Sequence, residues 1–205
     1  MSVDDSFQNL LTHVGNLLKE KGFRRTGKVF HWLNLENWAV ISFQRSTKGS
    51  AQLIAFTVNL GVASGSLLRF FGNPARVPTI DQCHWRQRLG FVMPEASDRW
   101  WRLSTDHDSE RLVDELSEAL VKFAIPAIEV HLQDTALRTV WESGVAPGIT
   151  ETDRQKYLSA LLKIEGLDCH SKQVAESLRI GAAGRPTADL AALHLARLGF
   201  GKRGG

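Results

Sequence analysis

Three consecutive segments in which apolar and polar side chains alternate place the strongest constraint on the fold of this chain. They span residues 28–33, 38–45 and 53–61, and the stretches between them, LENW and STKGS, contain residues that favour turns. In the third segment Ile54 and Phe56 fall on one side of an extended chain, while their neighbours fall on the other. Because a two-residue period turns one side toward a core, the pattern predicts an antiparallel β-meander with one apolar and one polar face.

Two further strands are predicted after a long excursion of the chain. Residues 61–82 are rich in Gly, Ser, Asn and Pro, so they lose the alternation and are expected to contain no more than one helical turn. Alternation returns over 84–92, where Trp85 belongs to the apolar side. A short fifth strand is predicted at 100–103. One of its two adjacent tryptophans should enter the core, and the other should pack under the excursion.

Amphipathic helices flank these strands. Apolar residues recur every three or four positions over residues 4–21, which predicts a helix with one buried face that ends at Gly22. A second helix is predicted from Ser109, whose hydroxyl suits an N-cap, to the residue before Pro126. The chain is therefore expected to have an α+β fold, in which an antiparallel meander of four to five strands packs on helices.

The remainder of the chain is predicted to be helical. A break is expected at GVAPG (144–148), after which Thr150 and Asp153 resemble a capping box that opens a helix. Two shorter helices are predicted at about 171–180 and 187–198. We therefore expect an α+β sheet domain at 1–143, a helical C-terminal region at 149–200 and a flexible tail at 201–205.

Composition describes a compact globular protein. Hydrophobic residues make up 43% and charged residues 23%, values that exclude a disordered or collagen-like chain. Apolar runs fall far short of the roughly 20 residues that cross a bilayer, and MSVDDSFQNL lacks a basic segment followed by an apolar one. These features predict no membrane association and a cytoplasmic location, with Cys83 and Cys169 as free thiols. The formal net charge of +3 permits contact with nucleic acid but does not indicate it.

Several landmarks occur together in the order that one protein family shows. They are LLKEKGFRRTGKVF (17–30), ISFQRS (41–46), FTVNLG (56–61), CHWRQRLG (83–90) and DRWW (98–101). By these landmarks the chain resembles the bacterial family known as domain of unknown function 4304 over residues 7–126. The resemblance implies no activity and no catalytic residues. Small bacterial families of this kind often accompany toxin and immunity pairs, so at most it implies a role of that kind.

The polar face of the predicted sheet is the candidate binding site. Its mixture of amide, hydroxyl, guanidinium and indole groups suits recognition, because arginine binds a carboxylate through two hydrogen bonds and tryptophan provides rigid contact area. The alternative interpretation is an ordinary solvent-facing sheet surface that the C-terminal helices partly cover. The candidate residues are His31, Trp38, Ser42, Gln44, Thr57, Asn59, Arg86 and Arg88.

The sequence contains no pattern that predicts a catalytic or metal site. The pairs Cys83-His84 and Cys169-His170, together with Asp106-His107-Asp108, supply metal-ligand types. Neighbours on a strand face opposite ways, however, and the spacings differ from those of zinc sites. No serine has the flanking residues of a nucleophile elbow. We therefore predict no catalytic residues, no metal and no cofactor.

Taken together, these features predict a non-enzymatic module that binds another protein, and in its most specific version the module neutralises a toxin-like partner. The alternative from a different class is a hydrolase or nuclease whose site lies between the sheet and the C-terminal helices. The third interpretation is a weak nucleic-acid binder, since residues 172–198 have the outline of a helix-turn-helix but carry few basic residues.

Overall fold

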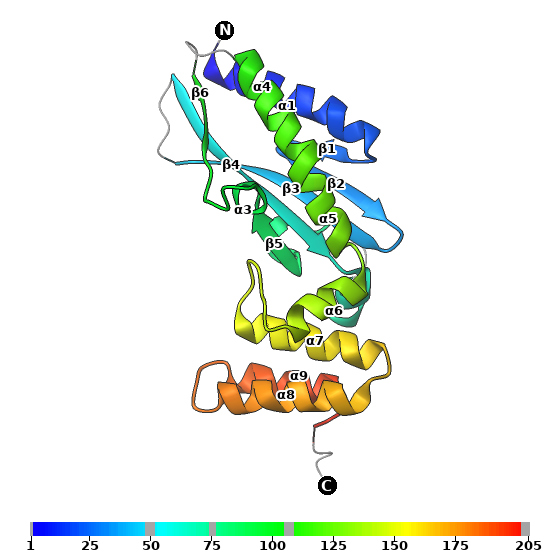
Figure 1. The fold of residues 1–205 in the computed structure, drawn as a ribbon. Helices are drawn as coiled ribbons and strands as arrows, with labels where there is room; N and C mark the ends of the chain where they lie inside the picture. The colour runs from blue at the N-terminus through cyan, green and yellow to red at the C-terminus, as the bar shows by residue number, and fades with distance from the viewer. Residues whose placement is uncertain (1, 48–51, 74–76, 105–108, 202–205) are drawn as a thin grey trace. The chain divides into compact units, whose positions relative to one another are not determined.

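The computed structural model describes residues 2–47, 52–73, 77–104 and 109–201 (Figure 1). The fold is α+β, as predicted, and it divides into two compact units. The N-terminal unit comprises Met1–Ser64 and Ala75–Gln133, and the C-terminal unit comprises Gly65–Pro74 and Asp134–Gly205. None of the described helices is both long enough and apolar enough to span a membrane.

A sheet that contains six strands among the described residues forms the centre of the N-terminal unit. The strands are β1 (Arg24–Thr26), β2 (Val29–Asn34), β3 (Asn37–Arg45), β4 (Leu53–Ala63), β5 (Trp85–Arg88) and β6 (Trp101–Ser104). All pairings are antiparallel in the order β1-β2-β3-β4-β5, and β6 pairs with the first half of β4. The predicted meander is confirmed. β1 is an additional strand, because three residues are too few for alternation to reveal it.

Helices cover one face of this sheet. These are α1 (Val3–Glu20), α4 (Ser109–Ala119) and α5 (Ile125–His131), and α1 and α4 run across the strands in Figure 1. Phe56 of β4 lies at the centre of the core, with its ring centroid 5.3 Å from that of Phe7, 5.9 Å from that of Phe43 and 6.1 Å from that of Trp101. The helix predicted over 4–21 is thus confirmed as α1, and its buried side chains pack on the apolar face.

The helix predicted to end before Pro126 continues through that residue. α4 leads into the π-helical segment η2 (Leu120–Ala124), and Pro126 lies in the first turn of α5. Proline is tolerated there because the first turn of a helix needs no N–H from it, and the wider π-turn absorbs the change in hydrogen-bond register. The Ser109 side chain, predicted as an N-cap, and the Asp106-His107-Asp108 cluster lie outside the described residues.

The fourth predicted strand is shorter than the alternation indicated. β5 ends at Arg88, and the next four residues form the short helix α3 (Leu89–Val92). Gly90 is packed against residues 97–99, and its carbonyl accepts a hydrogen bond from the Ser97 N–H at 3.1 Å. This close approach turns the chain out of the sheet, so that Phe91 is 44% exposed instead of lying on the apolar face.

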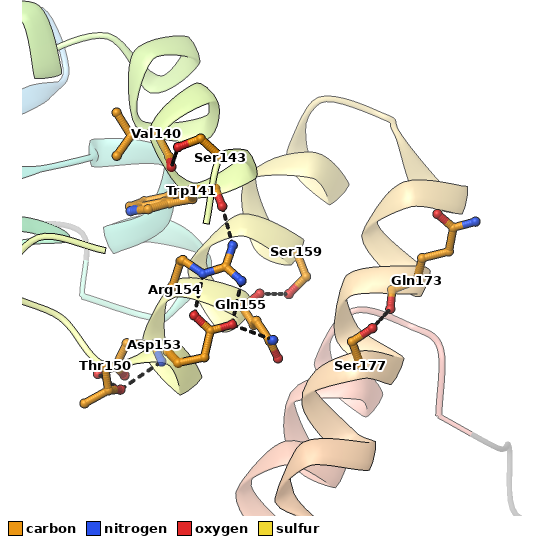
Figure 2. A network of polar contacts seen from close by, with 11 residues as sticks. Val140, Trp141, Ser143, Thr150, Asp153, Arg154, Gln155, Ser159, Gln173 and Ser177 are labelled. Carbon is orange, nitrogen blue, oxygen red and sulfur yellow. Dashed lines mark hydrogen bonds and ion pairs between the residues drawn. The ribbon is translucent and has the colours of Figure 1, made fainter. Parts of the chain in front are cut away.

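The C-terminal unit is helical. Its elements are α2 (Gly65–Phe70), α6 (Asp134–Glu142), α7 (Glu151–Ile164), α8 (Asp168–Ala182) and α9 (Ala188–Arg197). Figure 2 shows Arg154 of α7 beside the end of α6, where its guanidinium donates to the Trp141 carbonyl oxygen. The same guanidinium also donates to the carboxylate of Glu151. The bond to Trp141 connects α6 to α7, whereas the bond to Glu151 lies within α7. The helical character predicted for this region is confirmed, and residues 202–205 of the predicted tail lie outside the described residues.

The N-terminus of α7 carries one bond of the capping box that the sequence predicted, while the Asp153 carboxylate accepts from the Thr150 hydroxyl. Thr150 Oγ1 accepts a hydrogen bond from the Asp153 N–H at 3.1 Å (Figure 2). We expect Thr150→Ala to lower the free energy of unfolding by about 1 kcal/mol, because that N–H would lose its protein partner. Urea denaturation measures the loss. The matched control is Thr187→Ala, since Thr187 precedes α9 without a capping side-chain bond and should cost less. Equal losses at both positions would contradict the assigned cap.

Candidate functional site

All eight candidate residues lie on one face of the sheet, opposite α1. Phe56 points toward α1, so the residues that alternate with it along β4 point away. The pairing registers of β2, β3 and β5 continue that side across the sheet. We call it the polar face, and it carries His31, Trp38, Ser42, Gln44, Thr57, Asn59, Arg86 and Arg88.

Directly paired residues form a row across the middle of the polar face. Ser42 of β3 pairs with Asn59 of β4, and Asn59 pairs with Arg88 of β5. The Asn59 amide nitrogen donates to Gln44 Oε1 at 3.0 Å, and Gln44 is exposed. Since that bond uses only the carbonyl of the Gln44 amide, the NH₂ group of this side chain still carries two donors that face solvent.

Part of the polar face is covered. Thr57 is fully buried, and its hydroxyl donates to the Arg99 carbonyl oxygen at 3.0 Å. Gly61 is buried as well, and a Cβ at that position would lie 2.6 Å from the Sγ atom of Cys83. The segments around Cys83 and Arg99 therefore lie directly on the sheet. They remove Thr57 from the surface that a partner could reach, although the sequence analysis included it.

A three-residue cluster at the edge of the polar face holds Arg88 in place. Its Nη1 atom lies 2.6 Å from Oδ2 of Asp98, and its guanidinium carbon lies 5.4 Å from the centroid of the Trp100 ring. The Trp100 indole N–H also donates to Asp98, at 3.3 Å. The hydrogen bond from Arg88 is the main reason why the pKa of Asp98 is lowered, so this carboxylate is ionised at neutral pH. The ion pair with Asp98 thus holds the Arg88 guanidinium against the indole ring of Trp100.

Asp98 and Trp100 were not predicted as partners of Arg88. Of the two adjacent tryptophans, Trp101 is 3% exposed and enters the core, while Trp100 is 37% exposed. One inward and one outward tryptophan were predicted. The ring of Trp100 contacts the guanidinium of Arg88, a partner that was not predicted for it.

Two further arginines lie on the polar face. Arg24 pairs with His31 through β1, and Arg102 pairs with Ala55 through β6; both arginines are exposed. Arg24 was not predicted as part of this face because β1 is too short for its alternation to indicate a strand. The alternation in β6 was a usable signal for Arg102, since Trp101 and Leu103 turn inward on either side of it.

The remaining candidates, Arg86, His31 and Trp38, are half-buried. Arg86 Nη1 lies 3.5 Å from a carboxylate oxygen of Asp81. The His31 and Trp38 ring centroids are 6.0 Å apart. Burial, and secondarily the charge of Arg24, lowers the pKa of His31, so its imidazole is neutral at pH 7. This neutral ring adds a hydrogen-bonding group to the face but no charge.

The described residues assemble no metal centre. No group of three or more His, Cys, Asp or Glu side chains that could hold an ion occurs in the part of the chain that the structure describes. Both cysteines are free, with Cys83 buried and Cys169 exposed. Burial raises the pKa of the Cys83 thiol far above its usual range, which keeps it protonated and unreactive.

Comparison with known proteins yields one family. No curated protein and no solved structure matches the chain. The family described as "Domain of unknown function (DUF4304)" matches residues 14–130. That range contains every strand of the sheet and the polar face, whereas α6 to α9 follow it. Since the match spans more than half of the chain, the protein belongs to the DUF4304 family.

Proposed function

We propose that the polar face binds another protein without catalysing a reaction, and that the partner presents an acidic surface there. The observation that carries this proposal is the set of four arginines on one face: Arg24, Arg86, Arg88 and Arg102. Asp81 and Asp98 each contact one of them, which leaves an excess of positive charge in this group. Charge complementarity therefore favours an acidic partner.

The aromatic residues of the polar face support a protein partner. Arginine and tryptophan are enriched among the residues that dominate binding energy at protein interfaces. Arg88 is held by Asp98 and by the Trp100 ring, so it loses little side-chain entropy on association. Beside it, Trp100 and Arg102 line a groove of about 400 Å³ between β6 and α4, which offers room for a partner side chain.

Neutralisation of a toxin-like partner is the most specific version of this proposal. If the polar face covers the functional surface of the partner, it inhibits the partner by excluding the partner's target. Such inhibition needs binding residues but no catalytic group, and the polar face carries residues that suit binding. The chain's family is also similar in kind to small bacterial families that accompany toxin and immunity pairs, and this analogy favours the same role. Cytoplasmic location, where such a partner would meet the chain, is part of the proposal.

The proposal is tested by capture of partners on the full chain and on Arg86→Ala/Arg88→Ala. We expect an acidic protein to bind the wild type, and the purified partner to bind the variant at least about 30-fold more weakly, since loss of one interface hot spot costs about 2 kcal/mol or more. Mass spectrometry identifies the partner and calorimetry measures the affinity. Arg179→Ala/Arg185→Ala, at two arginines of the C-terminal unit, is the matched control and should bind normally.

Two outcomes would contradict the proposal. Unaltered affinity of Arg86→Ala/Arg88→Ala, with a circular dichroism spectrum like that of the wild type, would remove the polar face as the binding site. Tight binding of a short DNA duplex with a steep dependence on salt would instead favour the nucleic-acid interpretation, because phosphate contacts release counterions.

A further inference from the structure

A pocket of about 250 Å³ lies within the C-terminal unit, and none of its lining residues belongs to the polar face. It is formed by side chains of α7, α8 and α9 together with Phe71, which follows α2. Leu178, Ala191 and Leu193 contribute apolar wall, and Leu193 is 65% exposed at a position that lines the pocket. Apolar surface that is left accessible in a concave site is typical of ligand binding.

Two cationic side chains converge on one aromatic ring in this pocket. Lys156 Nζ lies 4.8 Å from the centroid of the Phe71 ring, and the guanidinium carbon of Arg197 lies 5.5 Å from the same centroid. Neither side chain forms an ion pair with another of the described residues. Positive charge is therefore concentrated beside apolar surface, a combination that suits an anion attached to an apolar group.

The acidic residue that lines the pocket is already engaged. Asp153 Oδ2 accepts a hydrogen bond from the Thr150 hydroxyl at 2.8 Å, and Asp153 lies in the first turn of α7, where the helix dipole stabilises a carboxylate. It does not form an ion pair with Lys156 or Arg197. Apart from His194, the titratable groups that line the pocket are thus two cations, Lys156 and Arg197, and one carboxylate, Asp153. The lining therefore carries an excess of positive charge.

His194 adds a neutral polar group to the wall of the pocket. Burial, followed by the nearby charges of Lys156 and Arg197, lowers the pKa of His194 to about 4. Its Nε2 atom lies 2.8 Å from the hydroxyl oxygen of Ser159. That hydroxyl also lies 2.8 Å from the Gln155 carbonyl oxygen and 3.1 Å from the Lys156 carbonyl oxygen, so two backbone acceptors compete with the imidazole for its one hydrogen.

The Ser159–His194 pair is therefore not a nucleophile with its base. Ser159 is fully buried within α7, where its hydroxyl bonds to the Gln155 carbonyl oxygen (Figure 2). A nucleophile must reach its substrate, and burial of this hydroxyl beside two backbone acceptors does not provide for that. The pair fixes the ring of His194, which stacks on Phe71 with centroids 6.0 Å apart. The pocket has the features of a binding site.

We propose that this pocket binds a small organic anion, namely a carboxylate attached to an apolar chain or ring. The apolar part occupies the space along Leu178, Ala191 and Leu193, and the carboxylate lies within reach of Lys156 and Arg197. The neutral imidazole of His194 leaves the two cations as the charged groups that recognise the anion. This site is independent of the polar face and of the proposed protein partner.

Octanoate is the probe, titrated into the full ¹⁵N-labelled chain and followed by two-dimensional NMR. We expect saturable shifts at amides of α7 and α9. Affinity should fall about tenfold or more in Lys156→Gln/Arg197→Gln, because each neutralised cation removes one favourable charge interaction with the carboxylate of the ligand. Lys172→Gln/Arg185→Gln removes two cations elsewhere in the same unit and should bind octanoate as the wild type does. Octylammonium should not compete.

The single variants Lys156→Gln and Arg197→Gln carry the test if the double variant fails to fold, and each should weaken binding by about threefold. Shifts that do not saturate, equal binding of octanol and octanoate, or unchanged affinity in the variants would overturn the proposal. Lys156→Gln/Arg197→Gln should retain the protein partner, whereas Arg86→Ala/Arg88→Ala should retain octanoate. The two proposals can therefore fail separately.

Discussion

Phe56→Ala is expected to lower the free energy of unfolding by about 3–5 kcal/mol, the largest effect that we predict for a single substitution. The Phe56 side chain is completely buried, and its ring contacts the rings of Phe7, Phe43 and Trp101. Truncation would leave a cavity between α1, β3 and β6 that these rigid rings cannot fill. Because small domains are stable by about 5–15 kcal/mol, the loss is a large part of the total.

Urea denaturation followed by tryptophan fluorescence measures this effect. Phe91→Ala is the matched control, since it makes the same change at a side chain that is 44% exposed and should cost far less. A similar loss for the two variants would mean that the core is not centred on Phe56. A drop in the denaturant midpoint at constant slope would assign the change to stability alone.

Gly90→Ala is expected to destabilise the N-terminal unit by about 1–3 kcal/mol, although it adds only one methyl group. The new Cβ would lie 2.3 Å from the Ser97 carbonyl oxygen and 2.7 Å from the Cβ of Arg99. Residues 97–99 must then move. They include Asp98, which binds Arg88, and Arg99, whose carbonyl oxygen accepts the hydrogen bond from Thr57. We therefore expect weaker partner binding together with lower stability, as measured by calorimetry and thermal unfolding.

The same substitution at Gly181 is expected to have the opposite sign. Gly181 lies within α8, and an added Cβ there would have no neighbour within 4 Å. Gly181→Ala should raise the free energy of unfolding by about 0.5–1 kcal/mol, because alanine restricts the unfolded chain and suits a helix. Destabilisation at Gly181, or no change at Gly90, would contradict the packing described for these two positions.

Local pattern was sufficient for most of the secondary structure. The period of α1, the alternation of β2 to β4 and the Thr150 cap each depend on residues a few positions apart, so the sequence predicts them directly. The end of β5 was mispredicted because alternation continues past Arg88 in the sequence. What ends the strand is the packing of Gly90 against Ser97, which alternation does not encode.

In the candidate site, too, some features follow from the local sequence pattern and others depend on tertiary packing. That Gln44, Asn59 and Arg88 share one face follows from backbone geometry and antiparallel pairing, and the sequence alone determined it. That Thr57 is covered follows from a segment more than forty residues away along the chain, as the hydrogen bond to Arg99 shows.

The sequence by itself determined the fold class, the long helix α1, the meander of β2 to β4 and the side of the sheet to which the side chains of those strands point. These properties depend on the dihedral preferences and the periodicity of neighbouring residues. Only the tertiary structure placed Trp100 over Arg88 and brought Lys156 and Arg197 to the ring of Phe71. Such contacts join residues that are remote in sequence or belong to different elements, and they depend on how whole elements pack, which no local pattern specifies.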